Sequence, residues 1–126
     1  MCVRYALNTP ATSADAMLHM VMESLERRFP GMAKTGEIGP GDTAPALIGR
    51  EGRVVAVPAV FGWPGFDGGR PLVNARAETA AGKPTFAESL GGRRHVLPAT
   101  GRYEGGRGAG GPEITYHFPP RGAPAV

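Results

Sequence analysis

Glycine and proline interrupt this chain so often that long regular elements are excluded over most of its length. The 126 residues include 20 glycines and 13 prolines. Proline removes a backbone donor, and glycine loses the most conformational entropy on folding, so both residues end helices and strands. This content lies near the boundary at which low-complexity disorder begins. We therefore expect one domain with short strands, many turns and one modest core.

One segment, residues 12–29, contains neither glycine nor proline and predicts a helix. Thr12 and Asp15 form a capping signal at its start, and Pro30 with Gly31 ends it. Apolar side chains recur at helical spacing along it: Met17, Val21, Leu25 and Phe29, widened by Leu18 and Met22. We interpret this methionine-rich stripe as core packing and not as a metal or cofactor site.

Short apolar runs between the turns predict about six strands and one short second helix. The strands are expected over residues 2–7, 46–48, 53–60, 72–74, 94–99 and 114–118, and the helix over residues 84–90. The runs at 46–48 and 53–60 form a hairpin around residues 49–52, and Pro58 indicates an edge strand or a bulge. Residues 36–45 and 105–112 are predicted loops. Because strands and helices do not alternate, the pattern indicates an α+β fold.

Charge and cysteine usage narrow the class of protein. The net charge is +3, and arginine supplies almost all of the positive charge, which is compatible with nucleic acid or with an ordinary basic surface. No apolar run approaches the ~18 residues of a membrane span, and the first residues lack a signal-peptide pattern. One cysteine excludes a disulfide framework and a cysteine-rich zinc site. We expect a cytoplasmic protein with no membrane partner, no metal and no small-molecule cofactor.

Cys2 is the most informative residue for chemistry. If Met1 is removed, Cys2 carries an α-amine and a thiol on adjacent carbons. Such an aminothiol condenses with an aldehyde to an imine, and the thiolate then closes a five-membered thiazolidine ring. Alternatively, the thiolate attacks a peptide carbonyl. The other interpretation is a small side chain that simply packs in the core.

Two further segments carry polar groups that can act together. Asn74, Arg76 and Glu78 are spaced by two in VNARAET, so an extended segment would place an amide, a guanidinium and a carboxylate on one face. A surface strand with an ion pair explains the same spacing. Glu104 follows an apolar run and precedes a glycine loop, where it is either a general acid or base or a solvated charge. His19, His95 and His117 lack a second ligand at metal spacing, and we interpret them as surface or packing residues.

Taken together, these segments resemble the SOS response-associated peptidase (SRAP) family. The resemblance covers residues 1–118 and is carried by a set of ordered motifs: the Met-Cys start, GEIGPGDTAP, FGWPGF, VNARAET, KPTFAESL and RRHVLPATGRYE. NARAET followed by this RR-x-x-x-P-A-x-G-x-Y-E pattern is a specific signal, whereas the Met-Cys start alone is weak. The resemblance implies one domain over residues 1–118, a small mixed, mainly antiparallel and partly barrel-like sheet with one longer and one short helix, and a disordered tail over residues 119–126.

The resemblance also implies an activity. Members of the family recognise abasic sites in single-stranded DNA and crosslink to them through an N-terminal cysteine thiazolidine, and the family name carries a peptidase activity. The implied enzyme class is hydrolase or lyase. By match, Cys2 is the nucleophile, Asn74 positions its amine and the sugar, and Glu104 assists ring opening and proton transfer. Arg4 and Arg76 match positions suited to phosphates. Trp63 is expected to lie on the same face as Phe61 and to stack on a base.

The chain departs from the family pattern at several positions. The usual tryptophan of W-G-F is Phe61, the usual F-Y-E-W is R-Y-E-G, and the usual cysteine of R-R-C is His95, expected to pack. The family's C-terminal portion and its late histidine are not matched, and His117 does not take that role. Two alternatives therefore stand beside the crosslinker: a cysteine peptidase with Glu104 or His95 as base, and an inactive nucleic-acid-binding remnant. The sequence does not indicate an oligomeric state.

Overall fold

The computed structural model describes residues 2–8, 16–107 and 110–119 of the chain. The capping signal at Thr12 and Asp15, and residues 120–126 of the expected tail, lie outside them. The strands are β1 (Arg4–Leu7), β2 (Gly36–Ile38), β3 (Thr43–Arg50), β4 (Arg53–Val60), β5 (Gly101–Arg107) and β6 (Glu113–Phe118). The helices are α1 (Ala16–Arg28), the single turn α2 (Ala77–Ala80) and α3 (Pro84–Gly92), with a 3-10 turn η1 (Phe66–Gly68).

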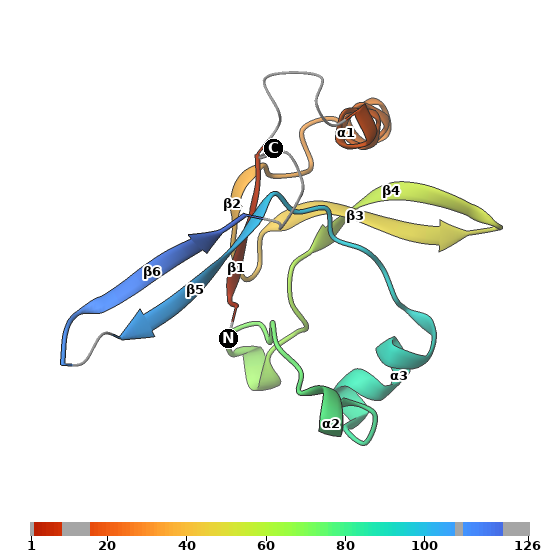
Figure 1. The fold of residues 1–126 in the computed structure, drawn as a ribbon. Helices are drawn as coiled ribbons and strands as arrows, with labels where there is room; N and C mark the ends of the chain where they lie inside the picture. Colours follow the sequence, from red (N-terminus) through yellow and green to blue (C-terminus); the bar gives the residue numbers. More distant parts are fainter. Residues whose placement is uncertain (1, 9–15, 108–109, 120–126) are drawn as a thin grey trace.

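The described strands form two antiparallel sheets. One has four strands in the order β2-β1-β5-β6, and the other is the β3-β4 hairpin. Figure 1 shows the β5-β6 pair and the β3-β4 pair projecting in opposite directions from the centre of the molecule, with α1 beside the hairpin. The predicted α+β class and the mainly antiparallel pairing are confirmed. The sheets do not close into a barrel.

The core lies where β1 passes between β2 and β5. Tyr5, Ala6 and Leu7 are all buried, because a central strand has both neighbours in place and is covered on its faces. The core cluster joins Tyr5 and Leu7 to Leu18 of α1, Ile38 of β2 and Ala44 of β3. One polar side chain, Thr100, is buried beside them and is satisfied, because its hydroxyl donates to the Ala6 carbonyl oxygen and accepts from the Asn8 amide.

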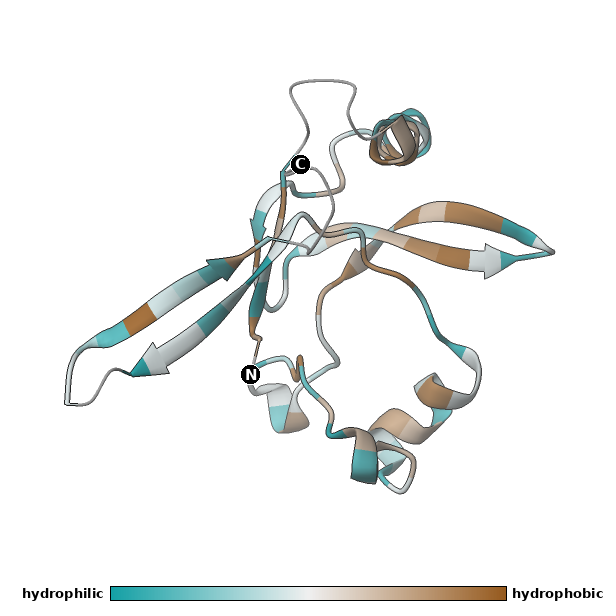
Figure 2. Cartoon of the chain, viewed as in Figure 1, coloured by the Kyte–Doolittle hydropathy of each residue, from teal (hydrophilic) through white to brown (hydrophobic). Residues whose placement is uncertain are grey.

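The hairpin follows from its sequence. Four of the eight residues of β4 are valines, and β3 carries Leu47 and Ile48; β-branched residues such as valine and isoleucine fit a pleated surface. Figure 2 shows this hairpin as a long hydrophobic stretch, whereas β5 is pale or hydrophilic. The hairpin is confirmed, and β3 begins at Thr43, before the predicted start. Among the described strands β4 pairs with β3 alone, so Pro58 does lie on an edge strand.

Two predicted strands are reduced to single bridges. Residues 72–74 contribute the Leu72–Trp63 bridge, and residues 94–99 contribute the Val96–Leu47 bridge. Pro71 and Pro98 flank these bridges and have no N–H to extend a ladder. Conversely, the predicted loop over residues 36–45 contains β2. Its three residues become a strand because they pair with β1. The short helix predicted over residues 84–90 is confirmed as α3.

The buried face of α1 is rotated slightly from the predicted stripe. Leu18 and Leu25 are buried, and Val21 and Met22 are half-buried between them. Met17, expected to point inward, is 73% exposed. Leu18, Val21, Met22 and Leu25 form a complete i, i+3, i+4, i+7 line by themselves, which leaves Met17 at the flank.

Candidate active site at the start of the first strand

Cys2 lies two residues before the start of β1 and is half-buried. Its thiol Sγ donates a hydrogen bond to the backbone carbonyl oxygen of Arg4 at 2.9 Å. The side chain is therefore held at the beginning of the central strand without being sealed in the core. Such a partly covered thiol is more accessible than that of a core cysteine, which is shielded from reaction.

Asn74 is brought to Cys2 from 72 positions along the chain. Its side-chain Nδ2 donates to the Cys2 backbone carbonyl oxygen at 2.9 Å. The residues around it are not helical, and Arg76 is still extended with φ −72° and ψ 127°. The side-chain amide therefore fixes the backbone of Cys2 from a neighbouring segment.

Glu104 lies at the same end of the sheet. β1 and β5 are antiparallel, and the register pairs Arg4 with Tyr103. Glu104 is the next residue of β5, in the direction in which β1 runs back to Cys2. Its side chain is 28% exposed, and its Oε1 lies 3.7 Å from Arg102 Nε. A partly covered carboxylate at this end of the sheet is suited to proton transfer.

The two expected phosphate-binding arginines have different surroundings. Arg4 Nη1 lies 2.6 Å from Glu37 Oε1, and its guanidinium lies over the Tyr103 ring at 5.4 Å. Arg76 is exposed and occupies the N-cap position of α2. The expectation that Asn74, Arg76 and Glu78 share one extended face is wrong for Glu78, because the chain turns into α2 at Ala77.

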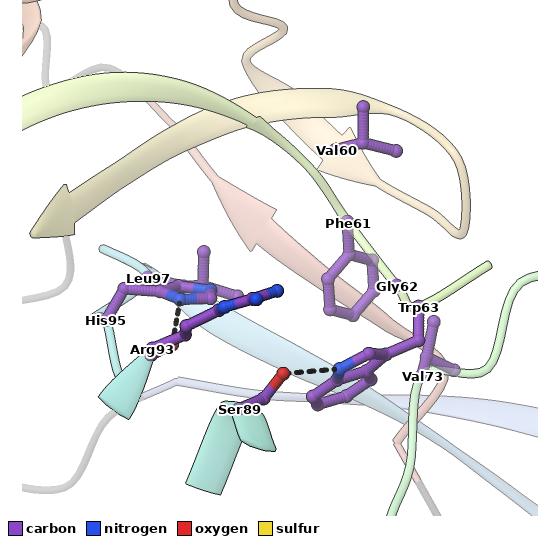
Figure 3. Close-up of a pocket in the computed structure, with 9 residues that line it drawn as sticks. All are labelled: Val60, Phe61, Gly62, Trp63, Val73, Ser89, Arg93, His95 and Leu97. Carbon is purple, nitrogen blue, oxygen red and sulfur yellow. Dashed lines mark hydrogen bonds between the residues drawn. The ribbon is translucent and has the colours of Figure 1, made fainter. Parts of the chain in front are cut away.

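The structure places Trp63 away from the sheet, against α3. Its indole Nε1 donates to Ser89 Oγ at 3.3 Å, and its ring meets Phe86 edge-on, with centroids 5.1 Å apart. Phe61 meets Tyr5 edge-on, with centroids 5.2 Å apart. Figure 3 shows that Phe61 and Trp63 both line one pocket.

Sequence reasoning missed part of this pocket. Ser89 and Arg93 also line it, and His95, which was expected to pack, is exposed at its border. The neighbouring aromatic segment FGWPGF and the run RRH were the available signals. Neither signal predicts that FGWPGF and RRH line the same pocket, because that arrangement depends on where α3 packs.

Two ionisable groups near the core have shifted pKa values. Burial, with a smaller effect of the Asp42 charge, raises the pKa of the Tyr5 phenol to about 12. The hydrogen bond from Lys34, 2.6 Å from the carboxylate, holds the pKa of Asp42 below its usual range, and the Gly39 amide adds to this effect.

Neither a metal centre nor a membrane span emerges from the part of the chain that the structure describes. Its His, Cys, Asp and Glu side chains do not gather in groups of three or more that could hold a metal ion. None of its helices combines the length and the apolarity needed to cross a bilayer.

Comparison with known proteins extends the sequence resemblance. A family model described as "SOS response associated peptidase (SRAP)" matches residues 1–124. A curated protein of Bacillus subtilis (strain 168), the "Abasic site processing protein YobE", is 50% identical over 36 residues. That match spans 29% of this chain and 16% of the relative's length. No solved structure gives a significant match.

Proposed function

The chain belongs to the SOS response-associated peptidase family, and from that membership we propose that it processes abasic sites in DNA by forming a covalent adduct at Cys2. The similarity to an abasic site processing protein supports the lesion as the substrate, although the matched segment is a small part of that relative. We assign this chemistry to a single domain over residues 1–118 and to single-stranded DNA.

The observation that carries the proposal is the hydrogen bond from Asn74 to the Cys2 carbonyl oxygen. It joins the NARAET segment to the residue whose amine and thiol would react. Glu104 lies at the same end of the β1-β5 pair. These two observations support a site in which a thiol, a side-chain amide and a carboxylate come from three separate segments.

The reaction that these groups support is a condensation. After removal of Met1, the Cys2 amine adds to the aldehyde carbon of the ring-opened sugar, and loss of water gives an imine. The thiolate then adds to the same carbon, and the nitrogen takes up a proton. One aminothiol and one aldehyde thus give one thiazolidine and one water, with no oxidant or reductant.

Each surrounding residue has a role in this reaction. Glu104 moves protons during sugar ring opening and dehydration. Asn74 holds the Cys2 backbone, so that amine and thiol face the same carbon. Arg4 and Arg76 bind phosphates of the strand, and Trp63 contacts a base, so adduct formation is expected to slow as salt is raised.

The test is adduct formation on a single-stranded oligonucleotide carrying one abasic site, followed on a denaturing gel. The wild-type chain is expected to give a shifted band that survives heating. Cys2→Ala is expected to give none, and Glu104→Gln a slower reaction. Cys2→Ser keeps the amine and the shape, so its imine should be seen after borohydride reduction. Equal bands for wild type and Cys2→Ala would falsify the proposal.

The state of the N-terminus provides an independent check. Mass spectrometry of the purified protein is expected to show a mass without Met1, because an amide-linked Cys2 nitrogen cannot form the imine. If Met1 is retained and adducts still form at Cys2, the thiazolidine assignment is wrong.

Peptide cleavage by the Cys2 thiolate is the alternative that the family description carries. Within the described residues, the side chains of Cys2 and His95 form hydrogen bonds with backbone carbonyl groups and not with each other. A cysteine peptidase needs a base beside its thiol, so His95 does not take that role in this geometry and a peptidase would depend on Glu104. Cleavage of test peptides that requires Cys2, measured by mass spectrometry, would favour the peptidase instead.

A further inference from the structure

A cavity of about 390 Å³ lies between the end of β4 and α3. Its volume is within the range of small-molecule sites. Phe61, Trp63, Val73 and Leu97 give it apolar walls. A second cavity of about 540 Å³ adjoins it and shares Trp63 with it.

The opposite wall is polar and basic. Ser89, Arg93 and His95 line both cavities, and Arg94 lines the second. Figure 3 shows the Arg93 side chain reaching across the cavity toward Phe61, and the Ser89 hydroxyl directed at the indole of Trp63. Arg93 is paired with Glu88.

Charge at this rim is positive on balance. Arg93, Arg94 and His95 are consecutive and exposed, whereas Glu88 brings one carboxylate. Arg94 donates its Nε–H to the Leu90 carbonyl oxygen at 2.8 Å, which holds it beside the end of α3. An apolar, aromatic cavity with a cationic rim fits a ligand that is planar at one end and anionic at the other.

The cavity is separated from Cys2 by one extended segment. Val73 lines the first cavity and Ala75 lines the second, while Asn74 between them donates to the Cys2 carbonyl oxygen. Alternation along the segment therefore places the cavities on one side and Cys2 on the other.

We propose that this cavity binds one nucleobase together with its phosphate. The base lies against Phe61 and Trp63, its polar edge meets Ser89 and His95, and Arg93 binds the phosphate. The nucleotide comes either from the strand beside the lesion or from the free pool. The strand source rests on the function proposed above, whereas the pocket itself does not.

Trp63 is the one tryptophan of the chain, so its fluorescence reports occupancy of the cavity. The Cys2→Ala protein, which cannot form the adduct, is titrated with an undamaged single-stranded oligonucleotide, with deoxyadenosine monophosphate, with deoxyadenosine and with inorganic phosphate. Saturable quenching by both the oligonucleotide and the monophosphate is expected, with weaker binding of deoxyadenosine. If the oligonucleotide binds more tightly than the monophosphate, the natural ligand is a nucleotide of the DNA strand. If the two affinities are equal, the natural ligand is a free nucleotide.

Variants test whether the response arises in this cavity. Arg93→Ala is expected to weaken binding about tenfold, the loss of one charge-assisted contact, and Arg93→Lys to recover part of it. Val60→Phe adds bulk at an exposed rim position and is expected to block the cavity without opening the core. Arg53→Ala is the matched control, because Arg53 begins β4 opposite Arg50 and lines neither cavity.

The outcomes separate this inference from the proposed function. Saturable quenching that Arg93→Ala and Val60→Phe weaken supports the pocket even if no abasic adduct forms. Absence of quenching, or equal affinities for wild type and both variants, overturns the pocket even if the adduct forms normally. Saturable binding of an apolar anion such as decanoate with no response to nucleotides also overturns it.

Discussion

At the scale of single residues, the phenol of Tyr5 is the most unusual group in the core. The side chain is 6% exposed, and within the described residues no partner lies at hydrogen-bond distance from its hydroxyl. A buried hydroxyl without a partner costs about 1–3 kcal/mol. Its aromatic ring nevertheless packs edge-on against Phe61. The ring contributes to stability here and the hydroxyl does not.

Tyr5→Phe is therefore expected to raise the free energy of unfolding by about 1 kcal/mol at neutral pH, since it removes the unpaired hydroxyl and keeps the ring. Urea denaturation followed by circular dichroism measures this change. Tyr103→Phe, on β5, is the comparison. A loss of stability in Tyr5→Phe would mean that the hydroxyl has a partner in the folded protein.

The same residue predicts a dependence on alkaline pH. An unfolded tyrosine loses its proton near pH ~10, whereas folded Tyr5 has a pKa of about 12. Between these values the unfolded state binds fewer protons, so stability present below pH ~10 is lost as the pH rises toward 12. Tyr5→Phe lacks this titration, and its advantage over the wild type is expected to grow in the same window.

The site residues show what sequence reasoning can and cannot supply. The resemblance selected Cys2, Asn74 and Glu104, and the structure brings their three segments to one end of β1. Spacing alone could not predict this, because Asn74 lies 72 residues from Cys2 and the contact forms only when the sheet assembles. Their roles remain predictions. Glu78 was misplaced because a one-turn helix begins one residue before it.

At the scale of elements, the β3-β4 turn places a glutamate in a backbone conformation that this residue type disfavours. Glu51 and Gly52 both have positive φ, 51° and 73°. A two-residue turn of this kind favours asparagine followed by glycine, and a glutamate in the left-handed region is strained.

Glu51→Asn is therefore expected to stabilise the protein by a few tenths of a kcal/mol, and Gly52→Ala to destabilise it by about 1 kcal/mol. No atom lies close to the added Cβ at Gly52, so the loss would be conformational and not steric. Thermal unfolding measures both variants. Equal stabilities for Gly52→Ala and wild type would contradict the backbone conformation of this turn.

Elements with strong local signals were predictable and those made by pairing were not. The helix pattern ending at Phe29, the hairpin and the helix from Pro84 follow from periodicity and turn residues. β2 is three residues in a glycine-rich stretch and exists because β1 pairs with it. The run over residues 94–99 was predicted as a strand, yet it forms only the Val96–Leu47 bridge within the described residues. Pro98 has no N–H with which to extend the pairing.

At the scale of the whole molecule, β6 is an open edge. It pairs with β5 on one side, and among the described strands no other adjoins it. Ile114, Tyr116 and Phe118 are 44–48% exposed along it. Apolar edge strands with free backbone groups promote association.

Ile114→Lys is expected to reduce concentration-dependent self-association, because a charge on an edge strand opposes pairing with another strand. Sedimentation velocity over a range of protein concentrations measures it. His19→Lys, on an exposed position of α1, adds the same charge elsewhere and is expected to have no effect. Identical sedimentation of Ile114→Lys and wild type would show that this edge is protected.

The central place of β1 also has a consequence for biosynthesis. The hydrogen bond from Thr100 to Ala6 joins groups 94 residues apart, and β5 follows directly after Thr100. β1 cannot pair with β5 until residues 101–107 have been synthesised, because contacts this distant wait for loop closure. The segment before β1 therefore stays accessible until β5 has been made, and we expect removal of Met1 to precede the pairing of β1 with β5.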